Sequence, residues 1–523
     1  MKKLKVCIPT AGMGSRVNEF SSGLNKSLID INYKPVISHI INLFPKETSF
    51  VIPIGYKGNF LKDYLKIVHP HKKITFVKIK NYQGKGSGLG LTLLKSKKFL
   101  NEPFIFVSCD TLVKNKIINV NHNWVGYSYQ YKKNSYRGFE ISKNGFVKKF
   151  LDKGQKTKNK AYNYIGLAGV YDYKNFWKKM EKYKNKSIPS GEFFGIKDLK
   201  NIKAYKFEWF DTGNSSSLKK TKIHFEKIGF KRNILPKLEE KIWFDEKLVI
   251  KYFKDEKIVK KRVKRSGYLK GYVPKIIKFS KNFYAYKEVE GEIMSKIKSE
   301  KIFHLFLKKL NMFHKIKPKL SNKQKKNFIE ICNNFYRVKT LKRIKDFEKK
   351  FQIKDNINSI NNKKMTKLSF LINKIDWKQI CDPKISRFHG DLHFENIIYQ
   401  KKNKDFVFLD WRHDFGGSIK YGDLYYDLAK IQHGLIVSHD KVSKQKFYVN
   451  QKNDNVSIRI SKPNIYKIYL KLFKIWLIKN NYDVNKVDIM TALIFLNIAS
   501  LHHYPYSKYL YYLGKEILSE KLN

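Results

Sequence analysis

Cysteines, acidic side chains and long apolar runs are all scarce in this 523-residue sequence. The four cysteines lie far apart and form no CxxC pair, which argues against a disulfide framework or a zinc site and favours a reducing, cytoplasmic location. Apolar runs stay short of the roughly 18 residues that a membrane span needs. The first of them breaks at Pro9 and predicts a strand rather than a signal peptide. The cysteines are Cys7, Cys109, Cys332 and Cys381.

The shortage of acidic residues leaves the chain strongly basic. Its 108 Lys and Arg residues stand against 44 Asp and Glu, a formal net charge of +64. Such a charge raises nucleic acid as a partner, but the lysines are spread through every segment and no basic tract alternates with stacking aromatics. We therefore expect anionic small substrates, such as nucleoside triphosphates, rather than a nucleic-acid surface.

The rest of the composition predicts a folded protein of more than one unit. Hydrophobic residues make up 42% of the chain and aromatic residues 15%, enough for real cores. Up to about Thr221, short apolar strands alternate with helical segments, as in a βα-wound parallel sheet that places ligands at the carboxyl ends of its strands. From about Ile242 a small strand meander is predicted, and after Met294 helical periodicity dominates.

The junction between the two parts carries no Gly/Ser-rich or Pro-rich tether. We place it between Lys222 and Pro236. The expected domains are residues 1–228, with a Rossmann-like α/β fold, and residues 233–523, with a small sheet lobe followed by a mostly helical lobe.

The clearest motif of the second part is HGDLHFENIIY at 389–399, followed by FVFLDW at 406–411. Phosphoryl transfer needs a carboxylate to orient and deprotonate a hydroxyl group, and oxygen ligands for Mg²⁺ on the nucleotide. Asp391 suits the first task, and Asn396 and Asp410 suit the second. A strand-loop-strand turn would bring all three to one cleft.

This motif resembles the catalytic segment of the aminoglycoside phosphotransferase and choline kinase family, over roughly residues 231–523. The resemblance implies a bilobal protein-kinase-like domain that uses ATP. It implies that Lys251 grips the nucleotide phosphates and that Asp423 and Asp427 brace the catalytic loop. The helical glutamate that should pair with Lys251 is missing from 257–269, as is the glycine-rich phosphate cover.

The first part opens with PTAGMGSRVNEFSSGLNKSLIDI, directly after the first predicted strand. Gly12 and Gly14 would let the backbone approach a triphosphate closely. Arg16 and Lys26 would neutralise it and the departing pyrophosphate.

This loop resembles that of the sugar nucleotidyltransferase family, and further matches follow in order. The resemblance implies that Gly84 and Gly86 contact the nucleotide base and that Asp110 and Asp211 hold the catalytic Mg²⁺. Nucleotidyl transfer needs such a pair, because metal must bridge attacking and leaving charge. In the same way, Lys153 would bind the substrate phosphate and Glu192 the acceptor hydroxyls. Near Lys153 the sequence has FLDKG where the family has an EKP motif.

The two activities fit consecutive steps, since a kinase makes a phosphate monoester and a nucleotidyltransferase consumes one. The expected function is ATP-dependent phosphorylation of a small alcohol, with a sugar as the leading choice. Coupling to a second triphosphate, CTP or UTP, would then give an activated metabolite for surface polysaccharide or lipid decoration. Choline or ethanolamine is the rival acceptor. A degenerate kinase half that only binds or regulates is a further alternative. The oligomeric state stays open.

Overall fold

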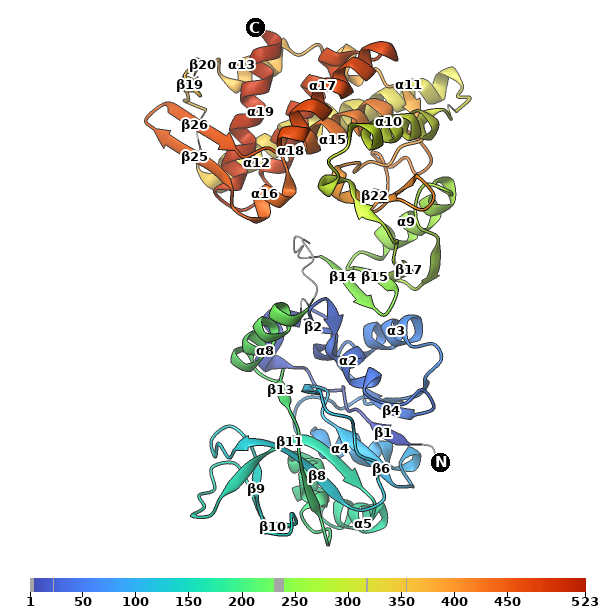
Figure 1. The fold of residues 1–523 in the computed structure, drawn as a ribbon, viewed down its shortest axis with the longest axis vertical. Coiled ribbons are helices and arrows are strands. Elements are labelled where there is room, and N and C mark those ends of the chain that lie inside the picture. The colour runs from blue at the N-terminus through green and yellow to red at the C-terminus, as the bar shows by residue number, and fades with distance from the viewer. Residues whose placement is uncertain (1–3, 22, 230–238, 317, 354) are drawn as a thin grey trace. The chain divides into compact units, whose positions relative to one another are not determined.

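The computed structural model describes residues 4–21, 23–229, 239–316, 318–353 and 355–523, which form two compact units (Figure 1). The first unit contains the described residues up to 229, together with 239–254 and 278–285. The second contains 255–277 and 286–523. The predicted junction, between Lys222 and Pro236, lies partly in 230–238, outside the described residues.

A nine-stranded sheet forms the centre of the first unit. Its middle is parallel, in the order β6-β1-β4-β5, and β11 joins it antiparallel to β6. Strands β9 and β10 extend the sheet beyond β11, while β8 pairs with both β11 and β12. The strands are β1 (Lys5–Cys7), β4 (Ser49–Ile54), β5 (Lys73–Lys78), β6 (Phe104–Val107), β8 (Trp124–Gln130), β9 (Gly138–Ile141), β10 (Val147–Leu151), β11 (Ala161–Val170) and β12 (Lys203–Lys206).

Both faces of the sheet are buried at its centre, as expected where parallel strands such as β4 and β6 are almost wholly apolar. On β1, Val6 belongs to one hydrophobic core and Cys7 to the other. This arrangement confirms the predicted Rossmann-like α/β architecture of the first part. The helices are α1 (Asn18–Ser21), α2 (Val36–Asn42), α3 (Gly58–Val68), α4 (Leu89–Ser96), α5 (Tyr173–Lys182), α6 (Lys184–Ser190), α7 (Glu192–Ile196) and α8 (Ser215–Ile228). Two short strand pairs accompany them, β2 (Asp30–Ile31) with β3 (Lys34–Pro35) and β7 (Thr111–Val113) with β13 (Trp209–Asp211).

Strands β14 (Glu240–Asp245) and β15 (Leu248–Phe253) pack with the first unit, although the sequence placed them in the second domain. Trp243 is buried in the same hydrophobic core as Tyr64 of α3, with the ring centroids 5.4 Å apart. The buried Asp245 carboxylate lies 2.6 Å from the Lys34 ammonium group and accepts a hydrogen bond from Asn42 at 3.1 Å. Sequence periodicity can predict that the β14–β15 hairpin forms. It cannot predict which surface the hairpin packs against. Strand β17 (Phe283–Lys287) pairs beside β15, and β16 (Ile276–Phe279) precedes it.

The second unit is mostly helical after residue 294, as predicted. A three-stranded sheet of order β18-β22-β23 carries part of the HGDLHFENIIY motif, and a four-stranded sheet has the order β20-β19-β26-β25. None of the described helices is long and apolar enough to cross a membrane. The helices are α9 (Glu256–Tyr268), α10 (Glu300–His314), α11 (Asn322–Asn333), α12 (Lys339–Phe351), α13 (Leu368–Lys374), α14 (Trp377–Cys381), α15 (Leu424–Ile436), α16 (His439–Ser443), α17 (Asn464–Lys479), α18 (Val484–Ala499) and α19 (Tyr506–Leu522). The strands are β18 (Glu292–Ile293), β19 (Ser359–Ile360), β20 (Lys363–Lys364), β21 (Ile385–Ser386), β22 (Ile397–Gln400), β23 (Asp405–Phe408), β24 (Gly422–Asp423), β25 (Phe447–Lys452) and β26 (Asn455–Ile460).

Truncating Trp243 tests the packing of β14 on the first unit. Trp243→Ala should lower the free energy of unfolding by about 3–5 kcal/mol, because a large buried ring leaves a cavity. Amide hydrogen exchange in α3 and β4 should accelerate. Lys247→Ala, in the exposed turn between β14 and β15, is the matched control and should change stability by less than about 0.5 kcal/mol. Unchanged exchange in α3 in the Trp243 variant would contradict this packing.

Candidate active sites

The first site lies where the parallel strands of the first unit end. The buried Asn25 side chain donates hydrogen bonds to the carbonyl oxygens of Thr10 (2.9 Å) and Tyr56 (2.8 Å), so it ties the loops after β1 and β4 together. Gly14 has a φ of +70°, and a Cβ there would come within 2.7 Å of the Cβ of Lys26. The predicted glycine loop therefore folds closely over Lys26, as only glycine allows. At Gly12 the structure has open space beside the backbone.

Asp110 and Asp211 are 101 positions apart in sequence, and pairing of β7 with β13 brings them together. Thr111 stands opposite Asp211 in this ladder, and the Thr212 backbone N–H donates to the Asp110 carbonyl oxygen at 3.0 Å. A Cβ on Gly213 would lie 3.0 Å from Asp110 Oδ2 and 3.1 Å from Asp211 Oδ1. The two carboxylates therefore face a common point beside Gly213.

Basic and hydroxyl groups hold Asp110 in its ionised form. Lys26 Nζ lies 2.8 Å from Asp110 Oδ2, and Ser108 Oγ donates to Oδ1 at 2.6 Å. Burial acts to raise the pKa of Asp110, but Lys26, Ser108 and Arg16 outweigh it and lower this pKa to about 2. Burial likewise acts to lower the pKa of Lys26, and Asp110 more than offsets it, so that this pKa is raised. Both groups are charged at neutral pH.

Asp211 is oriented by neighbours that the sequence motifs did not indicate. Its Oδ2 accepts hydrogen bonds from the Tyr136 hydroxyl (2.8 Å) and Asn214 Nδ2 (2.9 Å), and its Oδ1 accepts from the Gly213 N–H at 2.8 Å. Burial, followed by the charge of Asp211, raises the pKa of Tyr136 to about 12. Tyr136 stays protonated at neutral pH and acts as a donor.

The paired carboxylates fit a divalent cation. Hard oxygen ligands suit Mg²⁺, which is commonly held by one or two carboxylates and completes its shell with water and substrate phosphates. The glycine at 213 leaves room between the two carboxylates that any side chain would fill. Among the described residues there is no group of three or more His, Cys, Asp or Glu suited to a metal ion. Two carboxylates are therefore the largest acidic contribution available to a cation here.

Further basic side chains gather around the carboxylates. Lys153 has a lowered pKa because of burial, with Arg16 and Arg137 adding like-charge repulsion, while Asp211 acts in the opposite direction. The structure therefore brings the predicted Lys153 and Arg16 into the electrostatic range of Asp211. Arg137, which sequence reasoning missed, donates from Nη1 to the Ser190 carbonyl oxygen at 2.7 Å. No local motif marks Arg137, since it lies in an ordinary loop before β9.

The Gly84 and Gly86 turn precedes α4, as predicted for a loop that approaches a ligand. Both residues have positive φ, +79° and +78°. Tyr82, just before the turn, contacts Tyr56 with ring centroids 6.3 Å apart. The glycine turn thus begins beside the loop that follows β4.

Glu192 is almost fully buried at the start of α7. Burial raises its pKa to about 7, although Arg137 and Tyr164 act to lower it. Arg137 also lies over the Phe193 ring, 5.0 Å from the ring centroid. Glu192 is therefore linked through Arg137 to the basic groups near Asp211.

In the second unit the structure brings Asp391, Asn396 and Asp410 together. Asn396 Nδ2 donates to the Asp391 carbonyl oxygen at 2.9 Å, which leaves the amide oxygen of Asn396 to coordinate a cation. The Leu409 N–H donates to the Asn396 carbonyl oxygen at 2.7 Å, so the residue before Asp410 is bound directly to this loop. Asp410 has a φ of +56°, in the left-handed region. The amide and carboxylate oxygens of this set also suit Mg²⁺.

Helix α15 supports the loop that carries Asp391. Asp427 accepts hydrogen bonds from the backbone N–H groups of His389 and Gly390, both at 2.7 Å, which confirms its predicted bracing role. Asp423 instead caps α15 and accepts hydrogen bonds from Lys384 N–H and the Tyr336 hydroxyl group. Lys430, three residues after Asp427, lies 2.9 Å from Asp391 Oδ1. Sequence reasoning missed Lys430.

Helix α9 faces the catalytic loop with arginines where the family resemblance calls for a glutamate. Arg262 Nη1 lies 4.0 Å from Asp410 Oδ1. Arg265 is buried and donates to the Phe388 carbonyl oxygen at 2.7 Å. Lys251, which was predicted to grip the nucleotide phosphates, is buried on β15 and belongs to the first unit.

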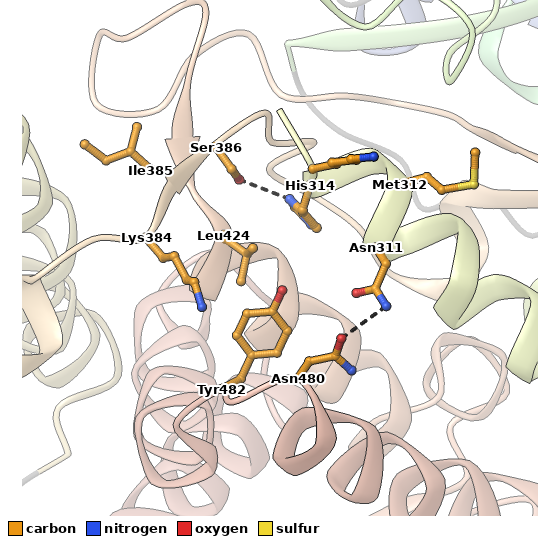
Figure 2. Close-up of a pocket in the computed structure, with 10 residues that line it drawn as sticks. Asn311, Met312, His314, Lys384, Ile385, Ser386, Leu424, Asn480 and Tyr482 are labelled. Carbon is orange, nitrogen blue, oxygen red and sulfur yellow. Dashed lines mark hydrogen bonds between the residues drawn. The ribbon is translucent and has the colours of Figure 1, made fainter. Parts of the chain in front are cut away.

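A separate pocket of about 450 Å³ opens beside α15 (Figure 2). Figure 2 shows Ser386 bonded to His314 on one side and Asn311 bonded to Asn480 on the other. It contains none of the predicted site residues. His314 Nε2, at this pocket, lies 3.7 Å from Asp427 Oδ2.

Comparisons with known proteins concern the first half of the chain. No protein-family model matches. Bifunctional protein GlmU of Methanococcus vannielii is 26% identical over 247 residues, 44% of this chain and 56% of the relative. That of Methanocaldococcus jannaschii is 24% identical over 252 residues, 46% and 58%. The chain thus spans little more than half the length of these curated relatives.

Solved structures show similarity over the same share of the chain. A UDP-glucose pyrophosphorylase complexed with UDP-glucose is 17% identical with a TM-score of 0.38, covering 43% of this chain and 100% of that one. The CTP:phosphocholine cytidylyltransferase of Streptococcus pneumoniae is 15% identical with a TM-score of 0.36, covering 42% and 99%. The sequence of the first part of the chain is therefore similar to that of these curated GlmU proteins.

The raised pKa of Glu192 predicts a pH-dependent stability. The ordinary pKa of glutamate in an unfolded chain is about 4.3, so between that value and pH 7 the folded chain holds one more proton than the unfolded chain. The free energy of unfolding therefore falls as pH rises through this window. Between pH 4.5 and 7.5 the wild type should lose about 3 kcal/mol more than Glu192→Gln, measured by urea unfolding. Glu181→Gln, on the surface, should follow the wild type, and parallel profiles for all three proteins would contradict the assignment.

Proposed function

We propose that the chain is a bifunctional enzyme whose second unit phosphorylates a small alcohol with ATP and whose first unit couples the product to a second nucleoside triphosphate. CTP or UTP is the second nucleotide in this proposal, and a sugar is the leading acceptor. The product would be an activated metabolite of the kind used in surface polysaccharide or lipid decoration. The observation that carries the proposal is the convergence of Asp110 and Asp211 beside Gly213.

The nucleotidyl transfer is supported by the charges around that pair. The phosphate monoester attacks the α-phosphorus of the triphosphate, the bond from this phosphorus to the bridging oxygen breaks, and pyrophosphate leaves. Arg16 and Lys26 neutralise the triphosphate and the leaving group, and Lys153 with Arg137 holds the attacking phosphate. Asp110 and Asp211 would hold Mg²⁺, which would stabilise the negative charge that develops on the phosphate oxygens. Sequence similarity to curated GlmU proteins supports this half.

The phosphoryl transfer is supported by the loop around Asp391. Its carboxylate accepts the proton of the attacking hydroxyl, and Asn396 and Asp410 supply the oxygen ligands for Mg²⁺ on ATP. Asp427 fixes the loop backbone from behind, so the carboxylate is positioned before substrate arrives. Lys251 as a phosphate ligand remains part of this proposal on the family resemblance alone.

The shared intermediate joins the two reactions, since one half makes a phosphate monoester and the other consumes it. Choline or ethanolamine in place of the sugar is the rival acceptor. A second unit that only binds a ligand and regulates the first is a further candidate, motivated by the arginines of α9 in place of a glutamate.

Two substitutions separate the activities. Asp110→Ala should reduce nucleotidyl transfer to a supplied phosphate ester by about 10³-fold, because the cation loses a carboxylate. Asp391→Asn should reduce ATP-dependent phosphorylation by about 10²–10⁴-fold, because the hydroxyl loses its base. Each variant should retain the other reaction within about threefold. Pyrophosphate release and ADP formation, assayed separately on the full chain, measure the two reactions.

The matched controls are Asp198→Asn and Asp346→Asn, exposed carboxylates of the first and second units, which should leave both reactions unchanged. If either active-site variant silenced both reactions in a folded protein, two independent sites would be the wrong description. If the second unit bound ATP but phosphorylated no alcohol, the regulatory alternative would be favoured.

A further inference from the structure

Basic side chains from three segments lie near the loop that carries Asp391, the proposed base of the second unit. Lys430 of α15 lies 2.9 Å from its carboxylate. Arg412 packs over the neighbouring Gly390, where an added Cβ would come within 2.6 Å of the Arg412 Cβ. Lys339 opens α12, and Arg343 follows one turn later on the same helix. Direct contacts thus place Lys430 and Arg412 at the Asp391 loop, and α12 carries two further cations.

A single aromatic ring fixes two of these cations relative to one another. Lys339 Nζ lies 4.5 Å from the centroid of the Phe335 ring, and Arg412 Cζ lies 5.0 Å from the same centroid. Phe335 is buried against Tyr426 of α15, with the centroids 5.1 Å apart. Lys339 and Arg412 therefore lie over a buried aromatic ring that packs against α15.

The acidic groups nearby do not balance this charge. In the described part of the chain, Lys339, Arg343 and Arg412 form no ion pair with a carboxylate. Asp414 is already bound by Lys261 at 2.5 Å. The pKa of Lys339 is lowered to about 7 by burial and by the charges of Arg412, Arg343 and Lys430. The neighbouring positive charges make Lys339 harder to protonate. A group of like charges held together in this way indicates an anion-binding site.

We propose that the alcohol phosphorylated by the second unit is itself an anion, carrying a carboxylate or phosphate group that Lys339, Arg343 and Arg412 bind while its hydroxyl faces Asp391. Hydroxy acids, sugar acids and sugar phosphates have this chemistry. The inference rests on the proposed phosphotransferase function and narrows its acceptor. It disfavours choline and ethanolamine, whose positive charge would be repelled by the same residues.

The nucleotide explains these cations less well than the acceptor does. Within this unit, Asn396 and Asp410 are the groups proposed to hold the metal ion of ATP. Helix α12 supplies neither of them, yet it carries both Lys339 and Arg343. The acceptor must reach Asp391 from a side that the nucleotide leaves open. Helix α12 is linked to the Asp391 loop by two contacts: Lys339 and Arg412 lie over the same Phe335 ring, and Arg412 packs on Gly390.

The reaction is balanced without any further reactant than ATP. The acceptor oxygen forms a bond to the γ-phosphorus, and the bond from this phosphorus to the β,γ-bridging oxygen breaks. ADP leaves, and the hydroxyl proton passes to Asp391. Lys430 holds the Asp391 carboxylate in place until the hydroxyl takes up its position.

The test offers the full chain Mg²⁺ and ATP labelled in the γ-phosphate, with a defined mixture of neutral sugars, sugar acids, sugar phosphates, hydroxy acids and amino alcohols. Mass spectrometry then identifies the labelled products. Label should enter members that already carry an acidic group. Label in neutral or cationic members would overturn the inference while leaving the phosphotransferase proposal intact. If the label appeared only in inorganic phosphate, or if no ATP were consumed, both the phosphotransferase proposal and this inference would be contradicted.

Variants then assign the cations on the acceptor so identified. Lys339→Gln and Arg343→Gln should each raise the KM for the acceptor by about tenfold, as expected when a charged hydrogen bond is lost, and change the KM for ATP by less than about twofold. Lys339→Arg should restore much of the affinity. Lys345→Gln, which removes an exposed charge from the same helix, is the matched control and should match the wild type. A rise in the KM for ATP with an unchanged acceptor KM would overturn the inference, because the cations would then bind nucleotide.

Discussion

Two carboxylates held side by side, Asp110 and Asp211, are the constraint on which the first site depends. Their mutual repulsion would work against the fold unless positive charge accompanied them. Lys26 supplies this charge at 2.8 Å from Asp110, and the glycine loop closes over Lys26 at Gly14. The glycine loop, Lys26 and the two aspartates therefore depend on one another: the loop packs on Lys26, and Lys26 offsets the negative charge of the aspartates.

In the second unit, helix α15 holds the loop of the proposed base in position. The β22–β23 pair brings Asn396 close to the residue preceding Asp410, and α15 holds the loop from behind. Because Asp427 and Lys430 lie one turn apart, the same face of α15 binds both the loop backbone and the Asp391 carboxylate. The position of the proposed base thus depends on how α15 packs as well as on the motif itself.

The sequence alone predicted those parts of each site that lie within a short motif. The glycine turn at Gly14, the strand-end Asp110 and the Asp391 loop each carry a local spacing that their chemistry requires. Residues without such a spacing were missed. Tyr136 and Lys430 reach their aspartates only through strand and helix packing, which no local spacing in the sequence specifies.

The same distinction applies to the fold. Alternating strands and helices were enough to predict the doubly wound sheet, and periodicity was enough to predict the helices after Met294. The packing of β14 on α3 could not be predicted, because it depends on the match between Trp243 and Tyr64 and on the partners of Asp245. Both are contacts between segments far apart in the chain.

The most direct measurement of the central constraint is cation binding at the first site. Electron paramagnetic resonance can count Mn²⁺ bound to the full chain in the presence of a non-hydrolysable CTP or UTP analogue. The shared position beside Gly213 predicts that Asp110→Asn and Asp211→Asn each remove the same bound ion, one per chain, and that the double variant removes no more. Retention of that ion in either single variant, or additive losses in the double variant, would contradict a common cation site.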